Sequence, residues 1–229
     1  VSEGNDTAAP VVTILEAPEG WLAGDGVVVA QVSDACDVSP TVTVDPAPGD
    51  RVDEGELHTL TYSAENIYEV TVTGTDDNDN PARVQAPAFG IDTTAPRVSF
   101  DGLDAPEDPN DPSTWPSLFA GESISFRAKA EDRAGDANSG LARGEAVLTH
   151  IDEDTSRVLL DTAFAPNDGD PAVGPRRVKN MECADVVPPG GRTWCDDDGD
   201  LAVGPLPPGD FRLTLTAWDL AGNAASLDR

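Results

Sequence analysis

Basic residues are scarce in this chain. It has 14 Lys and Arg residues, only two of them Lys, against 43 Asp and Glu residues in 229 positions. The formal net charge is −29, and both halves of the sequence are acidic. Such a surface repels phosphate backbones and anionic lipid headgroups, so nucleic acid is not an expected partner. Cations, water and proteins of complementary charge remain as partners.

Long apolar runs are also missing. No stretch reaches the length that a bilayer-spanning helix needs, so we expect no membrane insertion. The first residue, Val1, does not begin a signal peptide, and we expect a mature or excised soluble piece.

Catalytic motifs are few. The two histidines, His58 and His150, lie in predicted strands away from any Cys, and no Gly-x-Ser-x-Gly motif or Gly-rich phosphate loop is present. Paired carboxylates are abundant, but in so acidic a chain their adjacency carries little information. We therefore expect a protein that is not an enzyme.

Cysteine is rare, with three residues in all. Cys183 and Cys195 lie close together in a segment rich in Pro, Gly and Asp, whereas Cys36 stands alone. A loop with little apolar material gains most from a crosslink, so we predict a Cys183–Cys195 disulfide and an oxidising compartment. The alternative is two unpaired thiols. A zinc site is not indicated, because there is no Cys-x-x-Cys motif.

Two phrases recur in the same order. The segment 6–14, Asp-Thr-Ala-Ala-Pro-Val-Val-Thr-Ile, returns at 92–100 as Asp-Thr-Thr-Ala-Pro-Arg-Val-Ser-Phe. The segment 72–82 similarly aligns with 215–225, and each contains an Asp-x-x-x-Asn turn. The sequence therefore predicts two copies of one unit, at 1–92 and 93–229.

Helical periodicity is nearly absent, and short alternating runs are separated by Gly, Pro, Asp and Asn. This pattern is typical of an all-β protein made of Greek-key β-sandwiches. Strands are predicted at 10–16, 27–33, 41–44, 57–63, 68–75 and 83–89 in the first unit, and at 96–101, 123–131, 145–151, 157–161 and 211–218 in the second. The second unit carries an acidic loop insertion at about 163–208.

The motifs at the unit boundaries resemble those of bacterial immunoglobulin-like repeats in secreted adhesins. The similarity rests on 91–96 as the opening junction, 217–223 as the closing hairpin, and 130–132 followed by 139–141 as the loop between the second and third strands. The first unit is also similar to hyalin-type repeats. The resemblance implies two tandem immunoglobulin-like sandwiches in an extracellular or cell-surface protein of bacteria.

An immunoglobulin-like fold places the start of its first strand, its second-to-third-strand loop and its last hairpin at one end. Acidic residues occupy all three segments in both units, and their oxygens suit Ca²⁺. The alternative is that these residues only complete solvated turns. The candidate ligands are Asp92, Asp132, Asp136, Asp219 and Asn223 in the second unit, and Asp6, Asp34, Asp37, Asp76, Asp77, Asp79 and Asn80 in the first.

The insertion offers two further candidates. Asp196, Asp198 and Asp200 fail the spacing of an EF-hand but could form a looser calcium site, or else a solvated acidic loop. Trp194 adjoins Cys195, where it could contact a sugar or a protein, or pack against the predicted disulfide.

Together these features favour a non-enzymatic structural module of a surface adhesin, stalk or filament, rigidified by Ca²⁺. Its partners would be neighbouring repeats or identical subunits, and a surface protein or glycan is a further candidate. The alternative function is a glycan- or protein-binding module that uses the 163–208 insertion.

Overall fold

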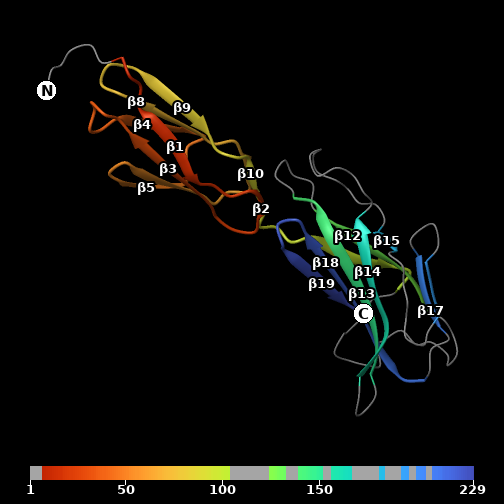
Figure 1. The fold of residues 1–229 in the computed structure, drawn as a ribbon. Coiled ribbons are helices and arrows are strands. Elements are labelled where there is room, and N and C mark those ends of the chain that lie inside the picture. Colours follow the sequence, from red (N-terminus) through yellow and green to blue (C-terminus); the bar gives the residue numbers. More distant parts are fainter. Residues whose placement is uncertain are drawn as a thin grey trace. The chain divides into compact units, whose positions relative to one another are not determined.

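The computed structural model describes residues 7–103, 124–132, 139–151, 156–166, 181–183, 192–195, 200–204 and 208–229. In some of the later strands only the backbone is described. The chain divides into two compact units, Val1–Thr93 and Thr94–Arg229. Strands account for all the regular structure in the described residues (Figure 1). That part of the chain accordingly contains no helix long and apolar enough to cross a membrane.

Unit 1 is a β-sandwich. One sheet has the order β1-β3-β6-β5, a second has β4-β8-β9, and a short third sheet has β2-β10-β7. The strands are β1 (Val11–Glu16), β2 (Gly20–Leu22), β3 (Gly26–Ser33), β4 (Thr41–Asp45), β5 (Asp50–Glu54), β6 (Leu57–Tyr62), β7 (Asn66–Tyr68), β8 (Thr71–Thr75), β9 (Pro81–Gln85) and β10 (Phe89–Ile91).

The strand order of unit 1 is that of an immunoglobulin domain of the constant type. With the strands lettered from A, the first sheet reads A-B-E-D and the second C-F-G. The first strand also changes sheets. After an irregularity between Ile14 and Glu16 in β1, the chain enters β2, which pairs in parallel with β10. The prediction of an all-β, immunoglobulin-like fold is confirmed.

The core of unit 1 follows from strict alternation. In β3, Val28, Ala30 and Val32 are buried and lie on the face opposite their neighbours. Aromatic side chains fill the far end of the sandwich, where the rings of Tyr68 and Phe89 stack with centroids 5.2 Å apart.

Tyr68 also closes a corner between strands E and F. Its hydroxyl donates to the carbonyl of Ala64, 2.8 Å away. This arrangement is the tyrosine corner found in many immunoglobulin-like domains. The hydroxyl of Tyr62 donates to Pro46 O at 3.0 Å, and burial raises the pKa of Tyr62 to about 12.

Unit 2 has two sheets, with the orders β11-β12-β17-β16 and β15-β14-β13-β18-β19. Lettered in the same way, the second sheet reads C″-C′-C-F-G, as in the variable type of immunoglobulin domain. The strands are β11 (Arg97–Asp101), β12 (Ile124–Glu131), β13 (Leu141–Ile151), β14 (Ser156–Pro166), β15 (Met181–Cys183), β16 (Arg192–Cys195), β17 (Asp200–Gly204), β18 (Asp210–Asp219) and β19 (Ala224–Asp228).

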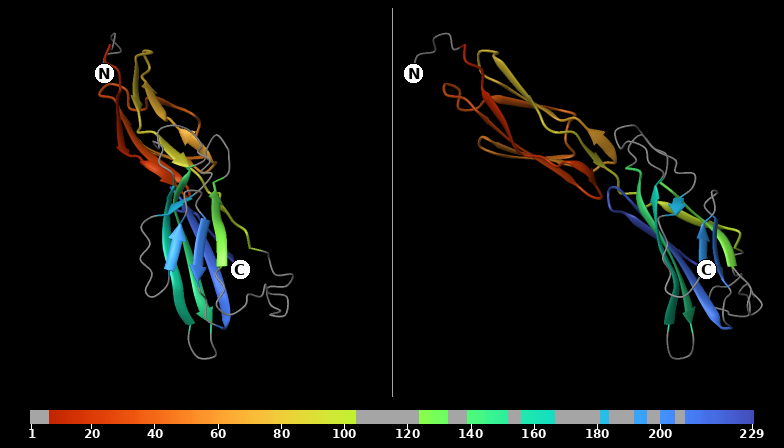
Figure 2. Two further views of the ribbon diagram at one scale, coloured as in Figure 1. Left: turned by 90° about the vertical axis from the view of Figure 1, so that its right-hand side faces the viewer. Right: turned by 45° about the vertical axis from the view of Figure 1, so that its right-hand side comes forward.

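The 163–208 segment differs from the expected loop insertion. Its described parts are strands: β15 extends one sheet, whereas β16 and β17 complete the other. These strands supply C″, D and E of the sandwich, so the segment belongs to the fold itself. Phe126, Leu148, Leu213 and Leu215 form the centre of the unit 2 core. Figure 2 shows the two sheets of this unit from two further directions.

Candidate functional site

Two buried aspartates lie at one end of the unit 2 sandwich, which we call its pole. Asp132 follows β12, and Asp219 ends β18. Both are only 2% exposed. A buried carboxylate is costly unless hydrogen bonds or a cation stabilise its charge, so their surroundings decide what this pole can do.

Asp219 organises the turn between β18 and β19. Its two carboxylate oxygens accept from the backbone N–H and the side-chain Nδ2 of Asn223, at 2.8 and 2.9 Å. Asp219 N also donates to Asn223 O at 3.0 Å, which closes the hairpin. Gly222 has a φ of 95°, a conformation that favours glycine. The Asp-x-x-x-Asn spacing thus builds a turn that holds the aspartate in one orientation.

The loop before β13 is joined to this turn. Gly140 N donates to Asp132 Oδ2 at 2.8 Å, and Gly140 O accepts from Leu220 N at 2.8 Å. The hydroxyl of buried Ser139 accepts from Ala221 N at 3.3 Å. Asp132 and Asp219 are therefore positioned by a common network of backbone hydrogen bonds.

Asp92 is the candidate ligand at the end of unit 1. It follows β10, is 2% exposed, and its N–H donates to Leu22 O at 2.9 Å. Within unit 2, one carboxylate oxygen of Asp132 and one of Asp219 lie within 4.8 Å of each other. Two hard oxygen donors at this spacing fit the chemistry of Ca²⁺, which takes six to eight such ligands. Asn223 is held against Asp219, and Asp136 lies outside the described residues.

Unit 1 repeats the turn. Asp76 accepts from Asn80 N at 2.8 Å and from Asn80 Nδ2 at 2.7 Å, as Asp219 does from Asn223. The Asn80 side-chain hydrogen bond lowers the pKa of Asp76, and the backbone N–H groups of Asn80 and Asn78 act in the same direction against the effect of burial. Asp79 stands where Gly222 stands in unit 2 and has a φ of 63°.

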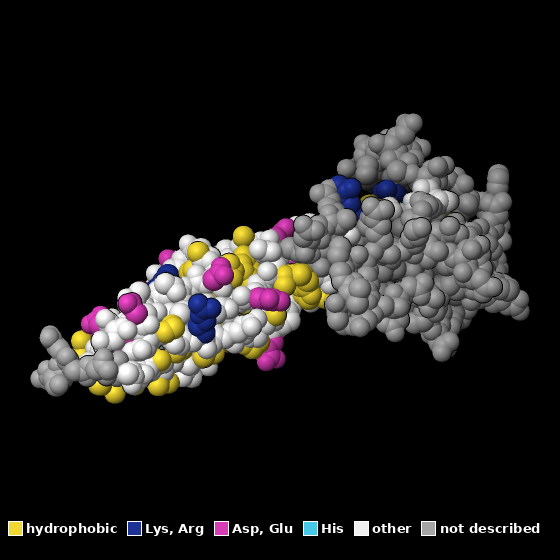
Figure 3. Space-filling view, turned by 90° about the horizontal axis from the view of Figure 1, so that it is seen from above, with side chains coloured by type: hydrophobic (Ala, Val, Ile, Leu, Met, Phe, Trp, Pro, Cys, Tyr) yellow, Lys and Arg dark blue, Asp and Glu magenta, His cyan; other side chains and the backbone are white. Residues whose placement is uncertain are grey.

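The other unit 1 candidates complete local turns. Asp34 Oδ1 accepts from the N–H of Cys36 at 2.7 Å and of Asp37 at 2.9 Å. Asp77 and Asp79 are exposed, and Asp6 lies outside the described residues. Among the residues described, Asp34, Asp76 and Asp79 belong to no group of three side chains that could hold a metal ion. On the face of unit 1 drawn in Figure 3, acidic side chains stand apart among uncharged and hydrophobic ones.

The candidates in the 163–208 segment are placed only in part. Cys183 ends β15 and Cys195 ends β16, and these strands belong to different sheets. Trp194 lies in β16, and Asp200 begins β17. The side chains of all four, and the whole of Asp196 and Asp198, lie outside the described part, so the disulfide, the ligand contact and the looser metal site stay predictions.

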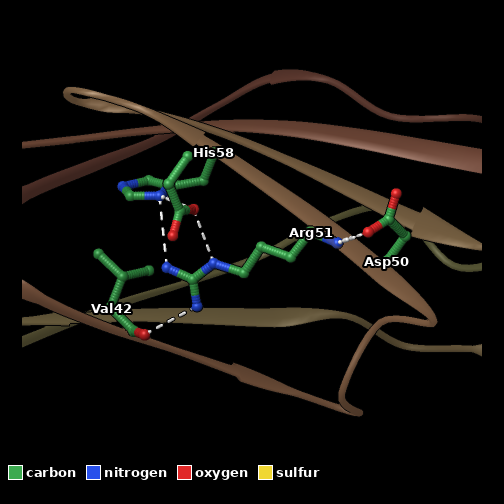
Figure 4. Close-up of polar contacts among 5 residues, drawn as sticks. Val42, Asp50, Arg51 and His58 are labelled. Carbon is green, nitrogen blue, oxygen red and sulfur yellow. Dashed lines mark hydrogen bonds and ion pairs between the residues drawn. The ribbon is translucent and has the colours of Figure 1, made fainter.

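One polar cluster was not anticipated (Figure 4). Arg51 of β5 donates through Nε to Asp53 Oδ1 at 2.7 Å and through Nη1 to Val42 O at 3.0 Å. Nδ1 of His58, which is 6% exposed, lies 2.7 Å from the same Asp53 oxygen. The hydrogen bond from Arg51, followed by that from His58, lowers the pKa of Asp53. The sequence signal that could have revealed this cluster is Gly55, whose positive φ allows a tight turn. That turn sets Asp53 of β5 opposite His58 of β6.

No protein-family model matches the chain, and no curated protein matches it. Among solved structures it is similar to fibronectin(III)-like modules of Clostridium thermocellum CbhA, with 15% identity, a TM-score of 0.31, and coverage of 95% of this chain and 91% of that one. It is also similar to dimeric latent PorU of Porphyromonas gingivalis, with 10% identity and a TM-score of 0.27. That match covers all of this chain and 20% of PorU.

Proposed function

We propose that the chain is a non-enzymatic structural module of a bacterial cell-surface or extracellular protein, such as an adhesin, stalk or filament. Its immunoglobulin-like units would act as tandem repeats, in contact with neighbouring repeats or identical subunits. Ca²⁺ held by Asp132 and Asp219, with Asp92 as a further predicted ligand, would stiffen it. The observation that carries the calcium proposal is the approach of two unit 2 carboxylates, each 2% exposed, to within 4.8 Å.

The energetic argument concerns like charges in a buried place. Ionised carboxylates at this spacing repel one another, and burial removes the water that would screen them. A divalent cation bound between the carboxylates attracts each of them, and this attraction replaces their mutual repulsion. Since Asp132 and Asp219 come from separate segments of unit 2, an ion bound by both would resist their separation.

Thermal unfolding with and without calcium tests the proposal. The purified chain would be melted at low ionic strength in EDTA and then in increasing free Ca²⁺. At a free concentration about 100 times the dissociation constant, binding to the folded state alone adds about 2.7 kcal/mol to the free energy of unfolding. The melting temperature should therefore rise with Ca²⁺, and more weakly in Asp132→Asn, which removes one charged ligand.

Asp77→Asn is the matched control, because it removes the same charge from an exposed position in the unit 1 turn. It should keep the full calcium response. Equal melting temperatures in EDTA and Ca²⁺, or an equal loss of response in both variants, would remove calcium from the account. Isothermal titration of the folded protein with Ca²⁺ gives the stoichiometry independently.

A further inference from the structure

The strand that follows the repeated Asp-x-x-x-Asn turn occupies the same place in the fold of each unit. β9 follows the Asp76–Asn80 turn and pairs with β8, and β19 follows the Asp219–Asn223 turn and pairs with β18. Within the described residues each has one sheet neighbour, so each is an edge strand. Figure 1 draws β19 as the dark blue strand beside β18. The two edges can therefore be compared position by position.

The hydrogen-bond pattern tells which backbone groups face outward. Leu213 and Arg229 exchange both backbone bonds, at 2.7 and 2.8 Å, so they form a hydrogen-bonded pair. In an antiparallel ladder such pairs recur at every second residue. The N–H and C=O groups of Ala224, Ser226 and Asp228 must then point away from β18. The same reasoning, from the Asp76 N to Asn80 O bond, applies to Pro81, Arg83 and Gln85 in β9.

The two edges differ at these outward positions. β9 begins with Pro81, which has no N–H to donate, and it carries Arg83 at its centre. Proline and charged side chains are the usual devices that prevent an edge from pairing with another strand. At the matching positions of β19 stand Ala224 and Ser226, both exposed. Neither of them obstructs pairing.

We propose that β19 pairs with β19 of a second copy of this chain, antiparallel and with a two-fold axis at Ser226. This register places Ser226 opposite Ser226 and Ala224 opposite Asp228 of the other copy. It joins the two C″-C′-C-F-G sheets into one continuous sheet. Such isologous pairing uses the same patch on both subunits and closes at two.

Charge supports an identical strand as the partner. In a protein of net charge −29, any contact between copies must avoid bringing carboxylates together. Asp228 is the one charged residue of β19, and the register sets it opposite an alanine rather than another aspartate. Repulsion between the rest of the two molecules is screened by salt, so dimerisation should strengthen with ionic strength.

The proposed function includes contact between identical subunits, and this strand pairing would define that contact. The pairing needs no metal ion. Association should therefore be equal in Ca²⁺ and in EDTA. Its failure would leave the calcium site standing, and a failed calcium response would leave the dimer.

Analytical ultracentrifugation of the full chain at micromolar concentrations, at physiological and high ionic strength, measures the association. The wild type should form dimers. Ala224→Pro combined with Ser226→Arg transfers the β9 residues to β19, and it should weaken the dimer at least about tenfold, because it removes donors and adds a charge at the axis. Amide exchange of Ala224, Ser226 and Asp228 should slow as the wild type associates.

Gln85→Arg is the matched control, since it adds the same charge to the edge of β9, and it should dimerise as the wild type does. Ser226→Arg alone serves if the double variant does not fold, which circular dichroism and a thermal melt would reveal. A monomeric wild type under all these conditions would overturn the proposal, and so would a dimer that survives Ser226→Arg or leaves the three amides unprotected.

Discussion

Replacing Arg51 by alanine should show which of its contacts stabilises unit 1 at the edge where β5 of one sheet lies near β4 of the other. Arg51 lies on β5, at the edge of one sheet, and its Nη1 reaches the carbonyl of Val42 on β4, at the edge of the other, 3.0 Å away. Its ion pair with Asp53 lies within β5 itself. Arg51→Ala removes both contacts, together with the 3.4 Å contact of Arg51 Nη2 with His58 Nδ1. Asp53→Asn removes the ion pair and keeps the bond between the sheets.

The magnitudes of the two contacts differ. The side chains of Arg51 and Asp53 are 30% and 50% exposed, so solvent screens their attraction, and such pairs contribute about 0.2 to 1 kcal/mol. A half-buried hydrogen bond from a charged donor contributes about 1.5 to 3 kcal/mol. We expect Arg51→Ala to lower the free energy of unfolding by about 2 kcal/mol, and Asp53→Asn by less than about 1 kcal/mol.

Differential scanning calorimetry of the full chain measures both effects. A loss of about 2 kcal/mol lowers the melting temperature of a domain of this size by about 10 °C. The unit 2 transition should stay in place and serve as an internal reference. Arg51→Lys keeps the charge but loses the fork of donors, so it should fall between the wild type and Arg51→Ala. Equal losses in Asp53→Asn and Arg51→Ala would show that the ion pair, not the bond between the sheets, is the stabilising contact.

Three further predictions concern unit 1. Tyr68→Phe removes the hydroxyl of the tyrosine corner and should cost about 1 to 2 kcal/mol of unfolding free energy in a urea titration; a neutral effect would contradict a structural role for that bond. Gly90→Ala places a Cβ against the ring of Trp21 and should destabilise by about 1 to 3 kcal/mol, with a change in Trp fluorescence; an unchanged spectrum and stability would mean that the ring does not cover Gly90. Because the Asn80 side chain lowers the pKa of Asp76 in the folded state, this carboxylate stabilises the fold above its unfolded pKa, and the stability is lost as pH falls through the folded value. Asp76→Asn should therefore flatten the acid side of the stability profile below about pH 4, and an unaltered profile would count against the assignment.

Sequence patterns located the strands that pack against a core. The alternation in β3, β6 and β18 reflects one buried and one exposed face, and these strands lie within a few residues of their predicted positions. β5 was missed because its sequence, Asp-Arg-Val-Asp-Glu, is almost all charged, and pairing with β6 rather than composition makes it a strand. β15, β16 and β17 were read as a loop for a similar reason, since they are short segments between Pro, Gly and Asp.

The candidate metal ligands were likewise predictable only in part from the sequence. The repeated turn and the end of the sandwich that it occupies sufficed to group Asp132 with Asp219, and one oxygen of each lies within 4.8 Å of the other. That these residues bind calcium stays a prediction. The equivalent reasoning for Asp34, Asp76 and Asp79 did not produce a group, because local hydrogen bonds occupy Asp34 and the Asp79 side chain faces solvent. The order of motifs along a chain predicts which loops lie at the same end of a sandwich. It does not predict which side chains in those loops are buried.

The parallel pairing of β2 with β10 has a mechanical consequence. Gly20, Trp21 and Leu22 lie beside Phe89, Gly90 and Ile91, near the two ends of unit 1 in sequence. A force that pulls those ends apart draws the parallel strands in opposite directions along their length, so their backbone bonds share the load and must break together. If the force instead separated the two strands from one end, their backbone hydrogen bonds would break one at a time. Tension between these two segments therefore loads the short parallel ladder in shear.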